Sequence, residues 1–441
     1  MWKRVCVGLL CLSCEALCNQ GRNYGRSVVA TPAGVVATSQ VAASQAGAQI
    51  LARGGSAVDA AIAANAVLAV TEPMMNGPGG DLFALYWDAK TGRLQGLNAS
   101  GPAPRALTPE FLAKAGHKEM PKDGIHSVTV PGAVDGWSKL HARYGKLPWK
   151  DLFQYAIAYA EEGFPVGESI QFFWTETEAV DKLRKSKESA RVFLPSGKPP
   201  DAGTMYCNPG LARAFRILAE KGTESFYKGK IAEAILATSR ELGGTLAAED
   251  LVSFSSEWVD PISAEYRGWR VYELPPNGQG MAALEMLNIM EALPTAPEGH
   301  DSAAEIHRRI ESMKLAYSDL KRFNGDPKYS DIPVNALISD QYARERAKLI
   351  DARKANCEVA AGVPLSGDTV YLAVADREGN TISLIQSISA TFGSGVAVSG
   401  MGFLLHNRGS LFTLEPKHPN VLAGGKRPFH TIIPAFMRKG D

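Results

Sequence analysis

Residues 367–376 read Gly367-Asp368-Thr369-Val370-Tyr371-Leu372-Ala373-Val374-Ala375-Asp376. The pattern predicts an acidic turn, a strand that opens at Thr369, and a tight turn at 377–380 into a second strand. If the Asp368–Thr369 peptide bond is cut, Thr369 becomes a nucleophile whose own freed α-amine serves as the base. The alternative is an ordinary strand, since threonine favours strands and Gly-Asp is common in turns.

The composition indicates a globular protein with a large core. The chain has 441 residues, of which 45% are hydrophobic and 21% charged. Lys and Arg total 47 against 46 Asp and Glu, so the net charge is +1. This balance provides no field that would attract nucleic acid, and no basic patch with interleaved aromatic residues is present. We therefore expect no nucleic-acid partner.

The first twenty residues resemble a signal peptide. A basic start, Met1-Trp2-Lys3-Arg4, precedes an apolar run over 5–14 that is too short to span a bilayer. This pattern predicts a periplasmic or secreted protein, and a misassigned start ahead of a cytoplasmic protein is the alternative. Cys11 and Cys14 lie inside the run without a second ligand pair, so we expect no metal site there. No later segment is long and apolar enough for a transmembrane helix.

The rest of the chain predicts an α+β protein in which strand-rich ends enclose a helical middle. Residues 76–81, Asn76-Gly77-Pro78-Gly79-Gly80-Asp81, form a glycine turn that favours close backbone packing over phosphate binding. Residues 182–191 are charged and helical, which favours a solvated face. Strands are expected at 35–38, 82–86, 269–274 and from 369 onward, and helices at 40–53, 56–70, 137–144, 149–162, 211–221, 231–241, 281–293 and 303–323.

Four motifs follow one another along the chain: Gly54-Gly55-Ser56-Ala57-Val58-Asp59, Gly77-Pro78-Gly79-Gly80, Val130-Pro131-Gly132-Ala133-Val134-Asp135-Gly136-Trp137 and Tyr144-Gly145-Lys146-Leu147-Pro148-Trp149. In this order, they resemble the γ-glutamyltranspeptidase family of N-terminal-nucleophile hydrolases. The resemblance begins near Ser27 and implies an αββα four-layer sandwich that cuts itself between Asp368 and Thr369. It implies one transpeptidase-like domain, with 27–368 as the large-subunit part and 369–441 as the start of the small subunit.

The same resemblance assigns roles to single residues near the nucleophile. Ser387 takes the place of the family's second threonine, whose hydroxyl supports the nucleophile, and a serine can form the same hydrogen bond. Arg408 stands near the substrate-reading positions and could bind a carboxylate, with a surface cation at a strand end as the alternative. The further candidates for substrate binding are Ser389, Asn407, His430 and Thr431.

At three positions where the family binds its substrate, this chain carries a different residue. Ser100 stands where the family has an arginine that binds the α-carboxylate of the donor, and Leu411 stands where the family has an aspartate that binds the donor's α-ammonium. His430-Thr431 replaces a Ser-Ser pair that follows Lys-Arg-Pro. Because an ammonium beside a leucine would cost several kcal/mol, the joint change predicts a different acyl donor. The pattern is similar to a branch that includes oxamate amidohydrolase and cephalosporin-type acylases.

The family also continues beyond the equivalent of Asp441 and supplies a Gly-Gly pair to the oxyanion hole from that continuation. From this difference we expect a fragment whose sandwich is incomplete at the C-terminus, with an unpaired strand edge and weak catalysis.

The first functional hypothesis is an autoprocessing amidohydrolase in which Thr369 attacks a small-molecule amide and forms an acyl-enzyme. Ser387 would orient the Thr369 hydroxyl, and no cofactor or metal is needed. The two fragments of the chain are expected to stay associated, with a homodimer of the processed pair left open. One alternative is a γ-glutamyltransferase or glutathione hydrolase in which Arg105 and Arg427 compensate for the missing arginine. The other is a truncated, unprocessed, non-enzymatic product.

Overall fold

The computed structural model describes residues 29–295, 299–357, 359 and 369–440. The predicted signal peptide over 1–20, its cysteines, and Asp368 on one side of the predicted cleavage site lie outside these residues. Export and cleavage therefore stay predictions. The chain divides into Met1–Pro32 and Ala33–Asp441, and the fold described below is that of the second unit.

A six-stranded antiparallel sheet runs through this unit in the order β1-β9-β10-β2-β3-β6. Its central strand β2 is an apolar run that is buried on both faces, which requires a packed layer on each side. Leu82 and Ala84 join the core on the helical side, whereas Phe83 and Leu85 join a cluster on the opposite side. The strands are β1 Gly34–Ala37, β9 Val370–Asp376, β10 Thr381–Ser387, β2 Asp81–Asp88, β3 Arg93–Ala99 and β6 Glu257–Val259.

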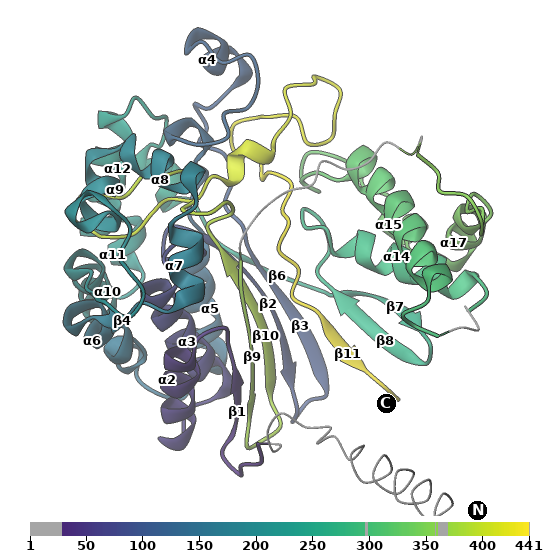
Figure 1. Cartoon of the computed structure of the whole chain (residues 1–441), viewed down its shortest axis with the longest axis horizontal. Coiled ribbons are helices and arrows are strands. Elements are labelled where there is room, and N and C mark those ends of the chain that lie inside the picture. The colour runs from purple at the N-terminus through teal and green to yellow at the C-terminus, as the bar shows by residue number, and fades with distance from the viewer. Residues whose placement is uncertain (1–28, 296–298, 358, 360–368, 441) are drawn as a thin grey trace, which may run out of the picture. The chain divides into compact units, whose positions relative to one another are not determined.

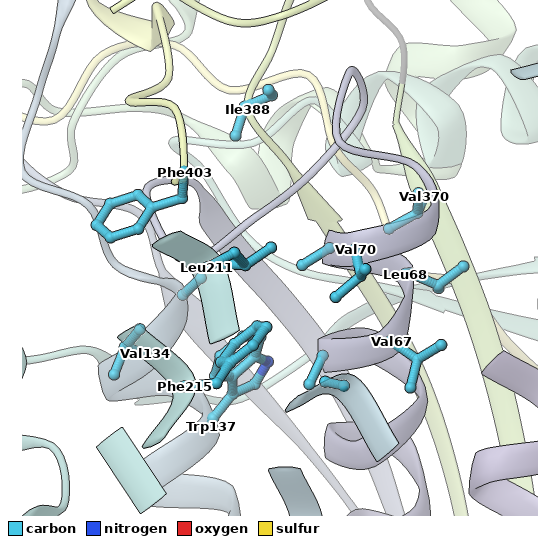
Figure 2. Packing of buried hydrophobic residues seen from close by; sticks show 14 of the residues in the cluster. Val67, Leu68, Val70, Val134, Trp137, Leu211, Phe215, Val370, Ile388 and Phe403 are labelled. Atoms are coloured by element: carbon cyan, nitrogen blue, oxygen red, sulfur yellow. The ribbon is translucent and has the colours of Figure 1, made fainter. Parts of the chain in front are cut away.

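Helix α3 (Ala57–Thr71) is the central element of the helical layer. It is completely buried, and its many alanines let neighbouring backbones approach closely. Ser56 and Asp59 close its N-terminus with a capping box. In Figure 2, side chains of α3 lie in one packed cluster with Trp137 and Phe215 from other helices and with Val370 of β9. The first residues of β9 are thus anchored in the main core.

A second, three-stranded sheet has the order β11-β8-β7 and packs against the far face of the first. Leu274 and Ile432 meet Phe83 and Leu85 between the two sheets. Its outer face is covered by α14 (Gly280–Ala292), with α15 (Ala303–Phe323) and α17 (Asp340–Ala347) beyond (Figure 1). Its strands are β7 Ile262–Tyr266, β8 Trp269–Glu273 and β11 Phe436–Arg438. The order helix, sheet, sheet, helix confirms the predicted αββα sandwich.

The remaining elements lie mainly on the outside of the first sheet. None of the described helices combines the length and apolar composition that a membrane crossing requires. The elements are α2 Val41–Ala52, α4 Pro109–Lys114, α5 Ala133–Tyr144, α6 Gln154–Glu162, α7 Glu168–Trp174, α8 Thr177–Arg184, α9 Lys187–Phe193, α10 Pro209–Lys221, α11 Glu224–Tyr227, α12 Lys230–Glu241, α13 Ala248–Val252 and α16 Val334–Leu337, with the short strands β4 Phe164–Pro165 and β5 Met205–Tyr206.

Most predicted elements are confirmed within a few residues, and the glycine turn packs as expected. A Cβ at Gly79 would lie 2.1 Å from the Leu404 carbonyl oxygen, and one at Gly80 would lie 2.4 Å from that of Ser387. The prediction for 182–191 is wrong in one respect. Lys182 is half-buried, and its Nζ donates to two backbone carbonyls rather than standing in solvent.

Candidate active site

The two predicted catalytic residues, Thr369 and Ser387, lie side by side at one end of the central sheet. Thr369 directly precedes β9, and Ser387 ends β10, the strand that pairs with β9. The Thr369 hydroxyl donates to the Ser387 Oγ at 3.2 Å. Ser387 is fully buried, and its Oγ also accepts the Ser389 N–H at 2.8 Å. The Thr369 side chain is therefore held by strand register and one serine.

The loop that follows Ser387 is strained and firmly held. Ser389 (φ 82°) and Phe392 (φ 58°) both adopt the left-handed region that non-glycine residues avoid. Asn407 holds the loop, because its Oδ1 accepts the Ala390 N–H at 3.0 Å. The Lys182 Nζ donates to the carbonyls of Thr391 (2.9 Å) and Gly393 (3.0 Å).

A cavity of about 1160 Å³ opens beside this loop. Of the predicted binding residues, Ser389, Asn407 and Thr431 line it, and Leu411 stands in the same wall. Charged side chains also line it, among them Glu178 and Lys182 of α8 and Glu415. The cavity can therefore hold a small polar molecule next to Ser389, whose amide is bonded to the serine that holds Thr369.

Arg408 lies behind the Thr431 side of this cavity. It is 1% exposed, so the alternative of a surface cation is wrong. Its Nη1 donates to the Thr431 Oγ1 at 2.8 Å. Its Nε and Nη2 atoms are buried and have no hydrogen-bond partner among the described residues. Burial lowers the pKa of Arg408 to about 10, against the opposing field of Asp81, so the guanidinium stays charged at neutral pH.

His430 belongs to a buried cluster with Asp81 and His406. The Ile432 N–H donates to its Nδ1, so its Nε2–H donates to the Asp81 Oδ2 at 3.0 Å. His406 Nδ1 lies 3.5 Å from the same oxygen. Burial, with the Arg408 charge as the next cause, lowers the pKa of His430 well below its usual range and that of His406 to about 3. Both imidazoles are neutral at pH 7.

Burial raises the pKa of Asp81 to about 7, although Arg408 and two backbone amides oppose the shift. Its Oδ1 accepts the N–H groups of Gly101 (3.3 Å) and Gly132 (3.2 Å). Asp81 pairs with Ser387 in the register of β2 and β10. The carboxyl group thus ties β2, which pairs with the strand that carries Ser387, to the segment that carries His430 and Thr431.

Ser100 and the two arginines proposed as substitutes do not line the cavity. Ser100 is fully buried, and its Oγ donates to the Asn98 Oδ1 at 2.7 Å. Arg105 and Arg427 line a separate cavity of about 390 Å³. Arg105 donates to the Ser253 Oγ at 3.2 Å, and Arg427 to Glu257 at 2.9 Å. Both cations are thus already engaged outside the cavity that Thr431 lines.

Sequence reasoning missed Asp81, His406 and Lys182. Asp81 had a usable signal, since it directly follows the tightly packed glycine turn and begins the buried strand β2. His406 immediately precedes the candidate Asn407, but a single histidine carries little information. Lys182 lies 209 residues from the carbonyl of Thr391, and a charged helical segment gives no sign of such a contact.

An αββα sandwich with a threonine hydroxyl at the head of a central strand is the architecture of N-terminal-nucleophile hydrolases. Residues 43–441 match the family model described as Gamma-glutamyltranspeptidase, and the chain belongs to this family.

Three relatives place the chain within the family. A glutathione hydrolase-like proenzyme of Bacillus subtilis is 38% identical over 416 residues, which are 94% of this chain and 78% of the relative. The oxamate amidohydrolase proenzyme of Klebsiella pneumoniae is 36% identical, over 90% of this chain and 75% of the relative. The crystal structure of cephalosporin acylase from Bacillus halodurans superimposes with a TM-score of 0.88 at 43% identity, over 96% of this chain and 78% of that one. The chain is an enzyme of the amidohydrolase kind.

Proposed function

We propose that this enzyme matures by cutting the Asp368–Thr369 bond and then hydrolyses an amide through an acyl group on Thr369. The observation that carries the proposal is the 3.2 Å hydrogen bond from Thr369 to Ser387 at the head of β9. That contact holds the hydroxyl of a residue that gains a free α-amine when the preceding bond is cut. Two of the relatives are named as proenzymes, which supports the maturation step.

In the proposed reaction, the Thr369 Oγ attacks the amide carbon while its α-amine accepts the hydroxyl proton. The amine then passes this proton to the leaving nitrogen, and the carbon–nitrogen bond breaks. Water attacks the resulting ester by the same path in reverse, which releases the acid and restores the hydroxyl. Ser387 orients the Oγ throughout.

The two fragments are proposed to remain together after cleavage. Strand β9 pairs with β1, and β10 pairs with β2, so both C-terminal strands are inserted between strands of the N-terminal part. Val370, Leu372 and Leu384 are buried in the main core. Separating the fragments would expose this apolar surface and break both ladders.

The proposed acyl donor lacks a free α-ammonium. Leu411 stands in the cavity wall beside Phe412, which also lines the cavity and is mostly buried. An ammonium placed against Leu411 would lose its hydration without gaining a partner. The relative named oxamate amidohydrolase acts, by its name, on a donor that has no ammonium group, which supports the proposal.

Glutathione hydrolysis is the second candidate. Glu178 and Glu415 line the same cavity and offer carboxylates to an ammonium from a different direction. Rates of hydrolysis of oxamate and of glutathione by the processed protein separate the two candidates. A higher specificity constant for glutathione would favour the second.

Intact-mass measurement of the purified protein tests the maturation step. We expect two fragments, the smaller beginning at Thr369, and a single uncut chain for Thr369→Ala, which has no hydroxyl. Hydrolysis by Thr369→Ala should fall by at least about 10³-fold, whereas Thr369→Ser should process slowly. A new N-terminus at another residue, or an uncut protein with undiminished activity, would refute the proposal.

A further inference from the structure

We propose that His117 and His126 are positioning residues whose hydrogen bond holds the 117–126 loop as one side of the cavity, and that acid releases this loop. The loop follows α4, which projects from the helical layer in Figure 1. Binding in the cavity should therefore be weaker at about pH 5 than at neutral pH. The inference rests on the proposed function only where KM is the measured quantity.

The first step of the argument is that the 117–126 loop supplies much of the cavity lining but has few contacts of its own. Residues 118–123 form no backbone-to-backbone hydrogen bond within the described part of the chain. The anchors of the loop include Met120, which packs in a small apolar cluster, and Asn407, whose Nδ2 donates to the Lys122 carbonyl at 2.7 Å. The loop residues that line the cavity are Lys118, Glu119, Met120, Lys122 and Asp123.

The second step is the direction of the hydrogen bond that joins the two ends of the loop. The His126 Nε2–H donates to the Gly243 carbonyl at 3.1 Å, so the neutral ring keeps Nδ1 as an acceptor. The His117 Nε2–H donates to this Nδ1 at 3.0 Å. The two rings are nearly perpendicular, with their centroids 5.2 Å apart. Because these histidines begin and end the loop, their hydrogen bond closes it at its base.

The third step is that protons break this hydrogen bond. The pair takes up one proton on the His117 Nδ1 with the bond intact. A second proton, on the His126 Nδ1, removes the acceptor and places two cations side by side. Histidine is the side chain that titrates between about pH 5 and pH 8, so mild acid is enough to separate the rings.

The surroundings of the pair offer no anion that would offset this charge. Helix α4 packs against the pair through Phe111, and the turn after α12 does so through Gly243. No carboxylate of the described residues lies within 4.0 Å of a nitrogen of either ring. The charged residues of these elements and of the loop are mixed in sign: Glu110 and Lys114 of α4, Lys118, Glu119, Lys122 and Asp123 of the loop, and Arg240 and Glu241 at the end of α12.

The test depends on two substitutions of His117 that act in opposite ways. In His117→Gln, the amide can donate through Nε2 or, when flipped, accept through Oε1, so it can bond the His126 ring in either protonation state. In His117→Ala, the bond is absent at every pH. His300→Gln is the matched control, because His300 is exposed and does not line the cavity.

The first readout is the rate at which dilute hydrogen peroxide oxidises Met120, followed by peptide mass spectrometry at about pH 7.5 and about pH 5. Met120 is 8% exposed because the loop holds its side chain in the apolar cluster, so release of the loop should expose its sulfur. In the wild type the rate should rise by about 3–10-fold at the lower pH. It should stay low at both pH values in His117→Gln and be high at both in His117→Ala. Met437, which is exposed, provides the reference rate.

The second readout is KM for the amide that the protein hydrolyses. The α-amine of Thr369 titrates in the same range, so KM is compared between wild type and His117→Gln at each pH, since both proteins carry that amine. The wild-type KM should exceed that of His117→Gln by about 3–10-fold at about pH 5 and equal it at about pH 7.5, with the ratio of kcat values unchanged. His117→Ala should have the higher KM at both pH values, and His300→Gln should behave as the wild type.

Equal Met120 oxidation in wild type and His117→Gln at about pH 5, or slow oxidation in His117→Ala, would overturn the inference. This readout needs no turnover, so it decides the inference even if the protein hydrolyses nothing. A pH-dependent exposure of Met120 without any hydrolysis would support the loop's release and refute the proposed function alone. Equal KM values in all variants of a hydrolysing protein would overturn the claim that the loop forms a side of the binding site.

Discussion

Thr369, the proposed nucleophile, and the wall of the cavity are built in different ways. Thr369 and Ser387 belong to neighbouring strands of one hairpin, and 18 residues separate them. In the wall, Arg408 meets Thr431, and His430 meets Asp81 across 349 residues of chain. The first contact follows from the register of a single strand pair. The contacts in the wall depend on segments brought together by the whole sandwich, so the wall residues can change while Thr369 and Ser387 are retained.

Of the changes around Thr369, loss of the Ser387 hydroxyl should lower the activity most. In Ser387→Ala, the Thr369 hydroxyl loses its partner, and the Ser389 amide loses its acceptor. We expect kcat/KM to fall by about 10–100-fold, with slower cleavage of the precursor. Ser387→Thr keeps the hydroxyl and is the matched control. Steady-state kinetics and the fraction of uncut chain provide the measurement, and equal behaviour of the two variants would contradict the assigned role.

A single substitution in the cavity wall should change which donor the enzyme prefers. Leu411→Asp places a carboxylate in the cavity lining, where the family resemblance puts an ammonium reader. The specificity constant for γ-glutamyl-p-nitroanilide should rise by about tenfold. Leu411→Asn is the uncharged control and should give no such gain.

Adding Ser100→Arg should not increase the gain of Leu411→Asp. Ser100 is fully buried and bonded to Asn98, so an arginine there would disrupt the network instead of reaching the cavity. A larger gain in the double variant would show that this position does read the donor.

Lys182 lines the cavity and also holds the strained loop that carries Ser389, so it connects the cavity wall with the Thr369–Ser387 pair. Lys182→Met removes two hydrogen bonds to loop carbonyls, and kcat/KM should fall by about 3–10-fold. Lys185→Met is the control on the same cavity. Lys185 is exposed and its bond to Asp123 (3.1 Å) is a surface ion pair, which contributes little. An equal loss of activity in both variants would contradict the interpretation that the Lys182 hydrogen bonds hold the loop in place.

Glu285 of α14 does not line the cavity and should affect stability alone. Burial, and then the neighbouring Asp319, raises the pKa of Glu285 to about 10, although the Arg346 charge opposes the shift. Asp319 is bound by Arg346 (2.8 Å) and by the Tyr342 hydroxyl (2.9 Å). Above pH 4.5 the unfolded chain ionises this acid while the folded protein keeps its proton, so stability falls as the pH rises toward 10.

Glu285→Gln should therefore raise the free energy of unfolding by about 1–3 kcal/mol at pH 8 and by little at pH 4.5. Urea unfolding at both pH values provides the measurement, with unchanged kcat/KM as the internal control. A gain of the same size at both pH values would refute the assigned ionisation.

The sequence by itself determined the family, the αββα class, most element boundaries and the Thr369–Ser387 pair. These features rest on local patterns: alternation along β9, the capping box at Ser56, and a hairpin whose turn sets the register that brings Ser387 to Thr369. Only the tertiary structure decided that Ser100 is buried, that Arg408 stands behind Thr431, and that Asp81 holds His430. Burial and pairing across hundreds of residues depend on how two sheets and their helices pack, and no spacing along the chain encodes that packing.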